Sequence, residues 1–137
     1  MSKDWVEDMA HMHEHYKVHD WVEKNKDNPE LMKKLLKFRL DFLQEELNEA
    51  YGAMDADDAE EVVDAMIDLC VVAIGTLDIY RVDSHKAWNE ILRANMAKEP
   101  GVKPSRPNPL GLPDLIKPEG WTGPDHTGNH GLLGKDE

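Results

Sequence analysis

Acidic side chains are concentrated in residues 40–80, where twelve carboxylates occur with no Lys or Arg, although the whole chain has 28 acidic and 16 basic residues. Six of these acids form two rows with helical spacing: Glu45, Glu46, Glu49, Glu61, Asp64 and Asp68. Side chains three or four residues apart overhang one side of a helix. Clustered carboxylates resist ionisation unless a cation lies among them, and oxygen ligands without cysteine suit Mg²⁺ or Mn²⁺. The spacing therefore predicts a site for divalent cations, which could neutralise bound phosphates.

Two helices must position these rows. Asn28 before Pro29 is typical of a helix start, and an apolar stripe with helical spacing continues to about residue 53. The acids at 55–58 can cap a further helix, which we expect to end near residue 80. A tight turn between the two helices makes them antiparallel neighbours, so that the acid rows can face each other across one groove.

Two other helices complete an all-α fold that resembles a four-helix bundle. We expect them at residues 3–16, from apolar side chains at intervals of three and four, and at 84–98, where Asp83 can cap the start. Seven of the eight prolines and seven of the nine glycines lie beyond residue 99, so no helix or regular strand is expected there. The chain thus divides into a helical domain, 1–99, and an extended Pro/Gly-rich tail, 100–137. The presence of Trp121 in the tail favours a segment that lies over a surface.

Composition argues against several classes of protein. The 137 residues fit one domain, and no apolar run reaches the roughly 18–20 residues of a membrane span. The first residues do not resemble a signal peptide, and the single cysteine, Cys70, excludes an intramolecular disulfide, so we expect a reducing cytoplasm. An acidic chain without a basic stripe lacks the charge pattern of a nucleic-acid binder. We therefore expect neither nucleic acid nor a membrane as a partner.

The acids also have simpler interpretations. The first row alone is more often a solvated helix face, although here no basic residue in the same window can pair with it. Asp64 and Asp68 differ from the others because they interrupt the apolar run between Val62 and Val72, where charged side chains are costly. The acids of the intervening turn we assign to caps and surface charge: Asp57, Asp58 and Glu60.

At these positions the sequence resembles a known family. The acid rows, EELNE at 45–49 and EVVD at 61–64, are similar to the EExxE…ExxD signature of the MazG-like, all-α nucleoside triphosphate pyrophosphohydrolases. The stretch DAMIDLCVVAIGTL at 64–77 looks like the DALADLLYVVYGTA of its small phage and bacterial members, which are related to phosphoribosyl-ATP pyrophosphohydrolase. Two later segments, ANMAK at 94–98 and PDLIKPEGW at 113–121, resemble the family's SNMSK and PDLxKPxGW.

The resemblance implies a MazG-type fold and hydrolysis of a nucleoside triphosphate between the α and β phosphates, giving a monophosphate and pyrophosphate. It assigns catalysis to Glu45 and Glu46, with Glu45 placed to act on the attacking water. The metal ligands that it implies are Glu45, Glu46, Glu49, Glu61, Asp64 and Asp68. The substrate contacts that it implies are Asn95, Lys98 and Lys117. Likeness to phage members favours a deoxynucleotide, with a purine such as dGTP as the first candidate, and the host cytoplasm if the chain is of phage origin.

A homo-oligomer is expected because the helix at 58–80 is apolar nearly all round and one chain cannot cover it. The resemblance points to a dimer or a dimer of dimers. We expect Trp5, Trp21 and Trp88 to pack in the core or between subunits. A second function also stays open, a non-catalytic helical module that binds metal or nucleotide in the acid groove without turnover.

Four histidines near the start of the chain invite a further metal site: His11, His13, His15 and His19. His15 and His19 have the spacing of one helical face, whereas His11 and His13 do not. No acid or cysteine motif accompanies them in the sequence. We therefore favour a polar helix face, or contact with the nucleotide base, over metal binding.

Overall fold

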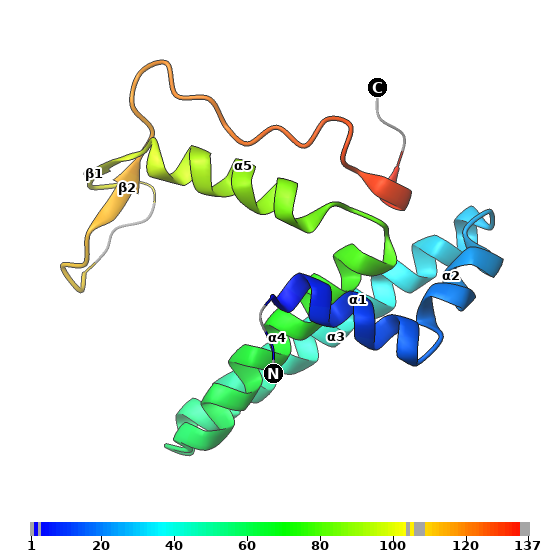
Figure 1. Ribbon diagram of the computed structural model, residues 1–137. Coiled ribbons are helices and arrows are strands. Elements are labelled where there is room, and N and C mark those ends of the chain that lie inside the picture. Colours follow the sequence, from blue (N-terminus) through cyan, green and yellow to red (C-terminus); the bar gives the residue numbers. More distant parts are fainter. Residues whose placement is uncertain (1, 3, 104, 106–108, 135–137) are drawn as a thin grey trace.

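Helices make up most of the chain (Figure 1). The computed structural model describes residues 2, 4–103, 105 and 109–134. Its α-helices are α1 (Trp5–His15), α2 (Val18–Asn25), α3 (Pro29–Asp55), α4 (Ala59–Ile79) and α5 (Ser84–Met96). Two short strands, β1 (Glu99–Gly101) and β2 (Asp114–Ile116), and a 3₁₀ helix (Gly131–Leu133) follow. The predicted all-α class is confirmed, and no helix of the described residues has the length and apolar character that crossing a membrane requires.

Helices α3 and α4 form a long antiparallel pair, and α1 packs against α4. Asn28 caps α3 by accepting a backbone N–H of the first turn, and Pro29 takes the first helical position. The reversal after α3 uses Asp57 in the left-handed region, with φ 53°. Asp58 then caps α4 by accepting the backbone N–H of Glu61 at 3.1 Å. Both predicted helix starts are confirmed, and Asp58 is a cap as expected.

The buried core lies where α2, α3 and α4 meet. Val22, Met32, Ile79 and Tyr80 form it, and the Tyr80 hydroxyl donates a hydrogen bond to the carbonyl of Met32. Leu132 from the 3₁₀ helix packs against this cluster, and its backbone N–H donates to the carbonyl of Tyr80 at 2.6 Å. The end of the described tail therefore covers the core.

The helix predicted over residues 3–16 is confirmed as α1, but the second helix, α2, was not predicted. Helix α1 ends at His15, and Lys17 takes the left-handed region with φ 62° before α2 begins at Val18. His15 and His19 therefore lie on different helices. The shared helical face predicted for these two histidines is wrong.

The tail contains regular structure, contrary to the prediction. Strand β1 pairs antiparallel with β2, with Pro100 opposite Leu115. Each strand has three residues, because proline cannot donate to a longer ladder of hydrogen bonds. The tail then runs back alongside α5 (Figure 1), where the indole N–H of Trp121 donates to the carbonyl of Ala94 at 2.7 Å.

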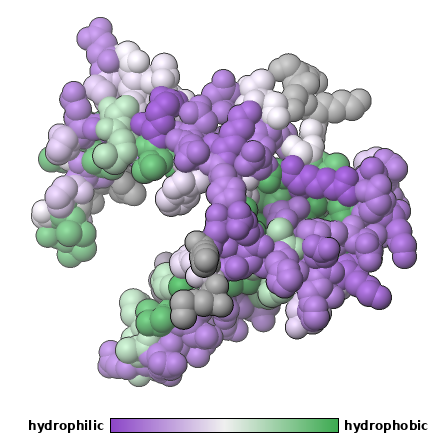
Figure 2. All heavy atoms as spheres, viewed as in Figure 1, coloured by the Kyte–Doolittle hydropathy of each residue, from purple (hydrophilic) through white to green (hydrophobic). Residues whose placement is uncertain are grey.

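The sequence predicts that a single chain leaves α4 incompletely covered, and the structure shows the same. Val63 and Met66 are 63% and 49% exposed. The three tryptophans expected in a core or subunit contact are also exposed in the single chain, at 54% for Trp5, 40% for Trp21 and 66% for Trp88. Figure 2 shows apolar side chains on both sides of the hollow between the α5 region and the helices below it.

Candidate functional site

The acid rows of α3 and α4 meet along the antiparallel pair, and Glu46 is their most buried member. Glu46 is 8% exposed, and its side-chain Oε2 has no hydrogen-bond partner among the described residues. Burial raises the pKa of Glu46 above its ordinary value, and repulsion from Glu49, Asp68 and Glu45 raises it further. A buried carboxylate oxygen without a partner is costly, so this atom calls for a cation or a donor.

The pKa values of two acids on α4 are raised, in part by an acid on α3. Burial raises the pKa of Asp68, and its neighbour Asp64 and then Glu49 from the facing helix add to the shift. Burial also raises the pKa of Glu61, followed by the effects of Asp64 and Glu49. The charge of Glu49 on α3 therefore contributes to the raised pKa of both Asp68 and Glu61 on α4.

The remaining acids lie at the rim of this acid cluster, which we define as Glu45, Glu46, Glu49, Glu61, Asp64 and Asp68. Glu45, Glu49 and Asp64 are exposed. Within the described residues, no three of the cluster's carboxylates bring ligand atoms within 4.8 Å of one another. The carboxylates are spread apart, as expected of groups that repel one another, so a bound cation would have to draw them together. The oxygen-only donor set and the orphaned Glu46 oxygen fit a hard dication such as Mg²⁺ or Mn²⁺.

Asn95, Lys98 and Lys117 lie apart from the acid cluster of the same chain. Helix α5 and the two strands project away from the end of the α3–α4 pair (Figure 1), and in the described part of the chain no hydrogen bond or ion pair joins these three side chains to the cluster. The strand pairing instead brings the two lysines to one indole ring. Their ammonium nitrogens lie 5.5 Å (Lys98) and 5.0 Å (Lys117) from the ring centre of Trp121.

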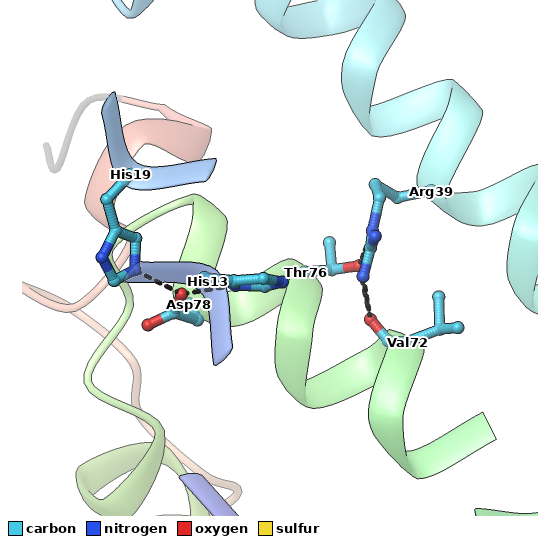
Figure 3. Close-up of polar contacts among 6 residues, drawn as sticks. All are labelled: His13, His19, Arg39, Val72, Thr76 and Asp78. Carbon is cyan, nitrogen blue, oxygen red and sulfur yellow. Dashed lines mark hydrogen bonds and ion pairs between the residues drawn. The ribbon is translucent and has the colours of Figure 1, made fainter. Parts of the chain in front are cut away.

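A second cluster, which sequence reasoning missed, joins three helices (Figure 3). Nδ1 of His13 and Nε2 of His19 lie 2.7 Å and 2.8 Å from the same oxygen, Oδ2 of Asp78. The ligand atoms of all three described side chains lie within 4.8 Å of one another. Asp78 is 65 and 59 residues away in sequence, so no local motif could reveal the contact.

Arg39 holds α3 against α4 beside this second cluster (Figure 3). Its guanidinium donates to Oγ1 of Thr76 at 2.9 Å and to the carbonyl of Val72 at 3.0 Å. Burial lowers the pKa of Arg39 from its ordinary value. Gly75 makes room for it, since a Cβ there would lie 2.9 Å from the guanidinium.

Comparison with known proteins bears on the same part of the chain. The family model described as phosphoribosyl-ATP pyrophosphohydrolase matches residues 16–95. That range contains the acid cluster and Asn95, whereas His13, Lys98 and Lys117 lie outside it. Neither the curated proteins nor the solved structures gave a match.

Proposed function

The chain belongs to the phosphoribosyl-ATP pyrophosphohydrolase family, and on this premise we propose that it hydrolyses a nucleoside triphosphate between the α and β phosphates. The family by itself indicates a nucleotide pyrophosphohydrolase, a hydrolase of phosphoric anhydrides. The finer proposal is that the substrate is a deoxynucleotide, with a purine such as dGTP as the first candidate. It is supported by the resemblance of residues 64–77 to small phage and bacterial members of the MazG-like group.

The buried Oε2 of Glu46 carries this proposal. It lies among acids whose pKa values are raised by burial and by one another, and no donor among the described residues satisfies it. A divalent cation is the partner that such an oxygen-only cluster fits. When bound, two or three Mg²⁺ or Mn²⁺ ions supply charge neutralisation to the triphosphate and a lower pKa to the attacking water.

The chain's own residues hold the metal and move the proton. The main ion is assigned to four side chains: Glu46, Glu49, Glu61 and Asp64. Asp68 supports a second ion or the nucleotide, and Glu45 at the exposed rim is the general base. As the water oxygen attacks the α phosphorus, the Glu45 carboxylate takes its proton. The bond from that phosphorus to the bridging oxygen breaks and pyrophosphate leaves.

We also propose that the active form is a homo-oligomer, a dimer or a dimer of dimers. An open groove of about 1080 Å³ lies between α1, α4, α5 and the end of the tail, and its lining includes Trp5, Cys70, Ile74 and Trp88. Such an apolar groove, together with exposed apolar side chains on α4, is typical of a surface that another subunit covers. The half-buried Cys70 contributes to this lining.

A second copy would also complete the site. Asn95, Lys98 and Lys117 do not reach the acid cluster of their own chain, although phosphates bound to that cluster need positive charge and hydrogen-bond donors. In the oligomer the arm of one copy, α5 with the two strands, would present these side chains to the cluster of its neighbour. The substrate would then contact two chains.

A panel of triphosphates tests the reaction. Purified protein is incubated with each ribo- and deoxyribonucleoside triphosphate, and with phosphoribosyl-ATP, in Mg²⁺ or Mn²⁺, and pyrophosphate and monophosphate are both measured. We expect equal amounts of the two products, with a purine deoxynucleotide cleaved fastest. Turnover of phosphoribosyl-ATP alone would overturn the triphosphate proposal. Orthophosphate as the only product would indicate a phosphatase instead. Tight binding of triphosphates without turnover would indicate a non-catalytic module.

A further inference from the structure

Three side chains from three helices converge on one point beside the core (Figure 3). They are His13 from α1, His19 from α2 and Asp78 from α4, and both imidazoles approach the same carboxylate oxygen. We propose that these residues form a second metal site, which takes a borderline transition-metal dication such as Zn²⁺. It is independent of the acid cluster and of the proposed hydrolysis.

The local fold builds this arrangement. The left-handed Lys17, with φ 62°, turns the chain between α1 and α2, so that His13 and His19 approach Asp78 from two helices. His13 is 5% exposed and fits closely, because a Cβ on Gly75 would lie only 3.2 Å from its Cε1. A buried imidazole held by packing, such as that of His13, is preorganised, which is what a metal ligand requires.

The donor set selects the class of metal. Two imidazole nitrogens and one carboxylate oxygen suit Zn²⁺ and similar ions, whereas Mg²⁺ prefers oxygen ligands alone. Without metal, each imidazole can donate its N–H to Oδ2 of Asp78. On binding, each neutral imidazole carries its proton on the other ring nitrogen, so that Nδ1 of His13 and Nε2 of His19 become ligand atoms.

The three ligand atoms already lie within 4.8 Å of one another and would have to adjust to a coordinating spacing. The observed distances of 2.7 Å and 2.8 Å must grow to about 3.3 Å, the spacing of ligands around tetrahedral Zn²⁺ at about 2.0–2.1 Å. His19 can provide this movement because its side chain is 40% exposed. Asp78 and His13 are fixed more firmly, at 17% and 6%.

The site also has an entrance and room for a fourth ligand. His19 and Asp78 line an open pocket of about 470 Å³, together with Arg81 and Asp83. The Arg81 guanidinium is paired with Glu23 on α2, which draws its charge toward that carboxylate. Water can therefore reach the ion from this pocket and occupy the fourth position that three protein ligands leave open.

This site is separate from the acid cluster. Asp78 follows Asp68 by ten residues on α4, which corresponds to a rise of about 15 Å along the helix. His13 also lies outside residues 16–95, the range that matches the family. A single ion cannot serve both sites.

Metal binding to the full-length protein tests the proposal. Chelator-stripped protein is titrated with Zn²⁺ against a chromophoric chelator in excess Mg²⁺, and Co²⁺ serves as a spectroscopic probe. We expect one tightly bound ion per chain and a Co²⁺ spectrum of a four-coordinate site with nitrogen ligands. Failure of the stripped protein to bind Zn²⁺ would overturn the proposal.

Matched variants locate the ion. His19→Gln and Asp78→Asn should weaken Zn²⁺ binding by more than ~100-fold, since changes outside the ligand set already cost about 10–100-fold. His11→Gln, an exposed residue of α1, should bind like the parent protein. Because His19 is partly exposed, His19→Gln should fold even if Asp78→Asn does not. Unchanged binding in His19→Gln would place the ion elsewhere and sink the proposal.

One more variant separates this proposal from the hydrolase proposal. Glu49→Gln should keep full Zn²⁺ affinity at the second site while it loses metal at the acid cluster. Loss of the tight Zn²⁺ ion in Glu49→Gln would show that the ion lies among the acids, and the second site would be rejected.

Discussion

Asp68 on α4 and Glu49 on α3 face each other across the helix pair, and Glu49 contributes to the raised pKa of Asp68 after the larger effects of burial and of Asp64. The two helices thus bring like charges together, although Glu49 itself is exposed to water. Repulsion of this kind opposes folding of the metal-free chain. A cation that binds the folded chain alone would offset it.

Removing one of these charges should stabilise the metal-free protein. The folded-state pKa of Asp68 is raised, so between its unfolded and folded values the folded chain holds a proton that the unfolded chain has released. The stability that this proton linkage provides is present below the unfolded pKa and is lost as pH rises through the folded pKa. Asp68→Asn should therefore melt at a higher temperature than the parent at about pH 7, with the difference shrinking toward about pH 4.

Thermal melts with and without Mg²⁺ measure this effect. Mg²⁺ should raise the melting temperature of the parent protein more than that of Asp68→Asn. Glu60→Gln, which removes an exposed acid on the same helix, serves as the control. If Asp68→Asn is the less stable protein at neutral pH without metal, the repulsion account is wrong.

Glu45→Gln should reduce turnover while it keeps metal affinity. Its carboxylate lies at the exposed rim and is assigned to proton transfer, so kcat should fall by about 10²–10⁴-fold. The Mg²⁺ concentration for half-maximal activity should change little. A variant that instead recovers full activity at high Mg²⁺ would identify Glu45 as a metal ligand alone.

Two glycines on the central helices should respond in opposite ways to alanine. At Gly75 a Cβ would lie 2.9 Å from the guanidinium of Arg39 and 3.1 Å from Cε of Met9. Overpacking costs about 1–3 kcal/mol and helix propensity returns about 1 kcal/mol, so Gly75→Ala should lose up to about 2 kcal/mol of unfolding free energy. Gly52 has no atom within 4 Å of that position, and Gly52→Ala should gain about 0.5–1 kcal/mol. Urea unfolding of both variants checks the contrast, and a stabilised Gly75→Ala would show that Arg39 moves away freely.

Mixing two inactive variants tests whether the site is shared between chains. Glu49→Gln damages the acid cluster and Lys98→Ala damages the arm. If each site combines the cluster of one chain with the arm of another, mixed dimers contain one intact site. Equal mixing with subunit exchange should then restore about a quarter of the parent activity, because half of the dimers are mixed and each has one of two sites intact. A mixture that stays inactive would confine each site to one chain.

Local sequence signals predicted where the main helices begin and how two of them pair. Asn28 with Pro29, Asp58 and Asp83 each cap the helix that follows them, and these starts depend on contacts within one turn. Helical periodicity likewise predicted that Glu49 and Asp68 each lie in a row of acids on one side of their helix. Because the turn between α3 and α4 is short, these local features also implied the antiparallel pairing that makes the acid rows face each other.

Contacts between distant residues could not be predicted in this way. Nothing in the sequence around Lys17 marks a left-handed residue, and the helix α2 that follows it was not predicted. The approach of His13 to Asp78 depends on the turn at Lys17 and on the packing of α1 against α4. The meeting of Lys98 with Trp121 depends on strand pairing in a segment where proline argued against strands.

The most direct test of the central claim compares pyrophosphate release by the parent protein, Glu49→Gln and Glu60→Gln on the preferred triphosphate. All three are assayed at the same Mg²⁺ concentration. Glu60→Gln, which carries the matched change outside the cluster, should release pyrophosphate at the parent rate. Glu49→Gln should lose most of the activity because a ligand of the main ion is gone. Release of pyrophosphate by Glu49→Gln at the parent rate would contradict the assignment of the acid cluster as the metal-binding active site.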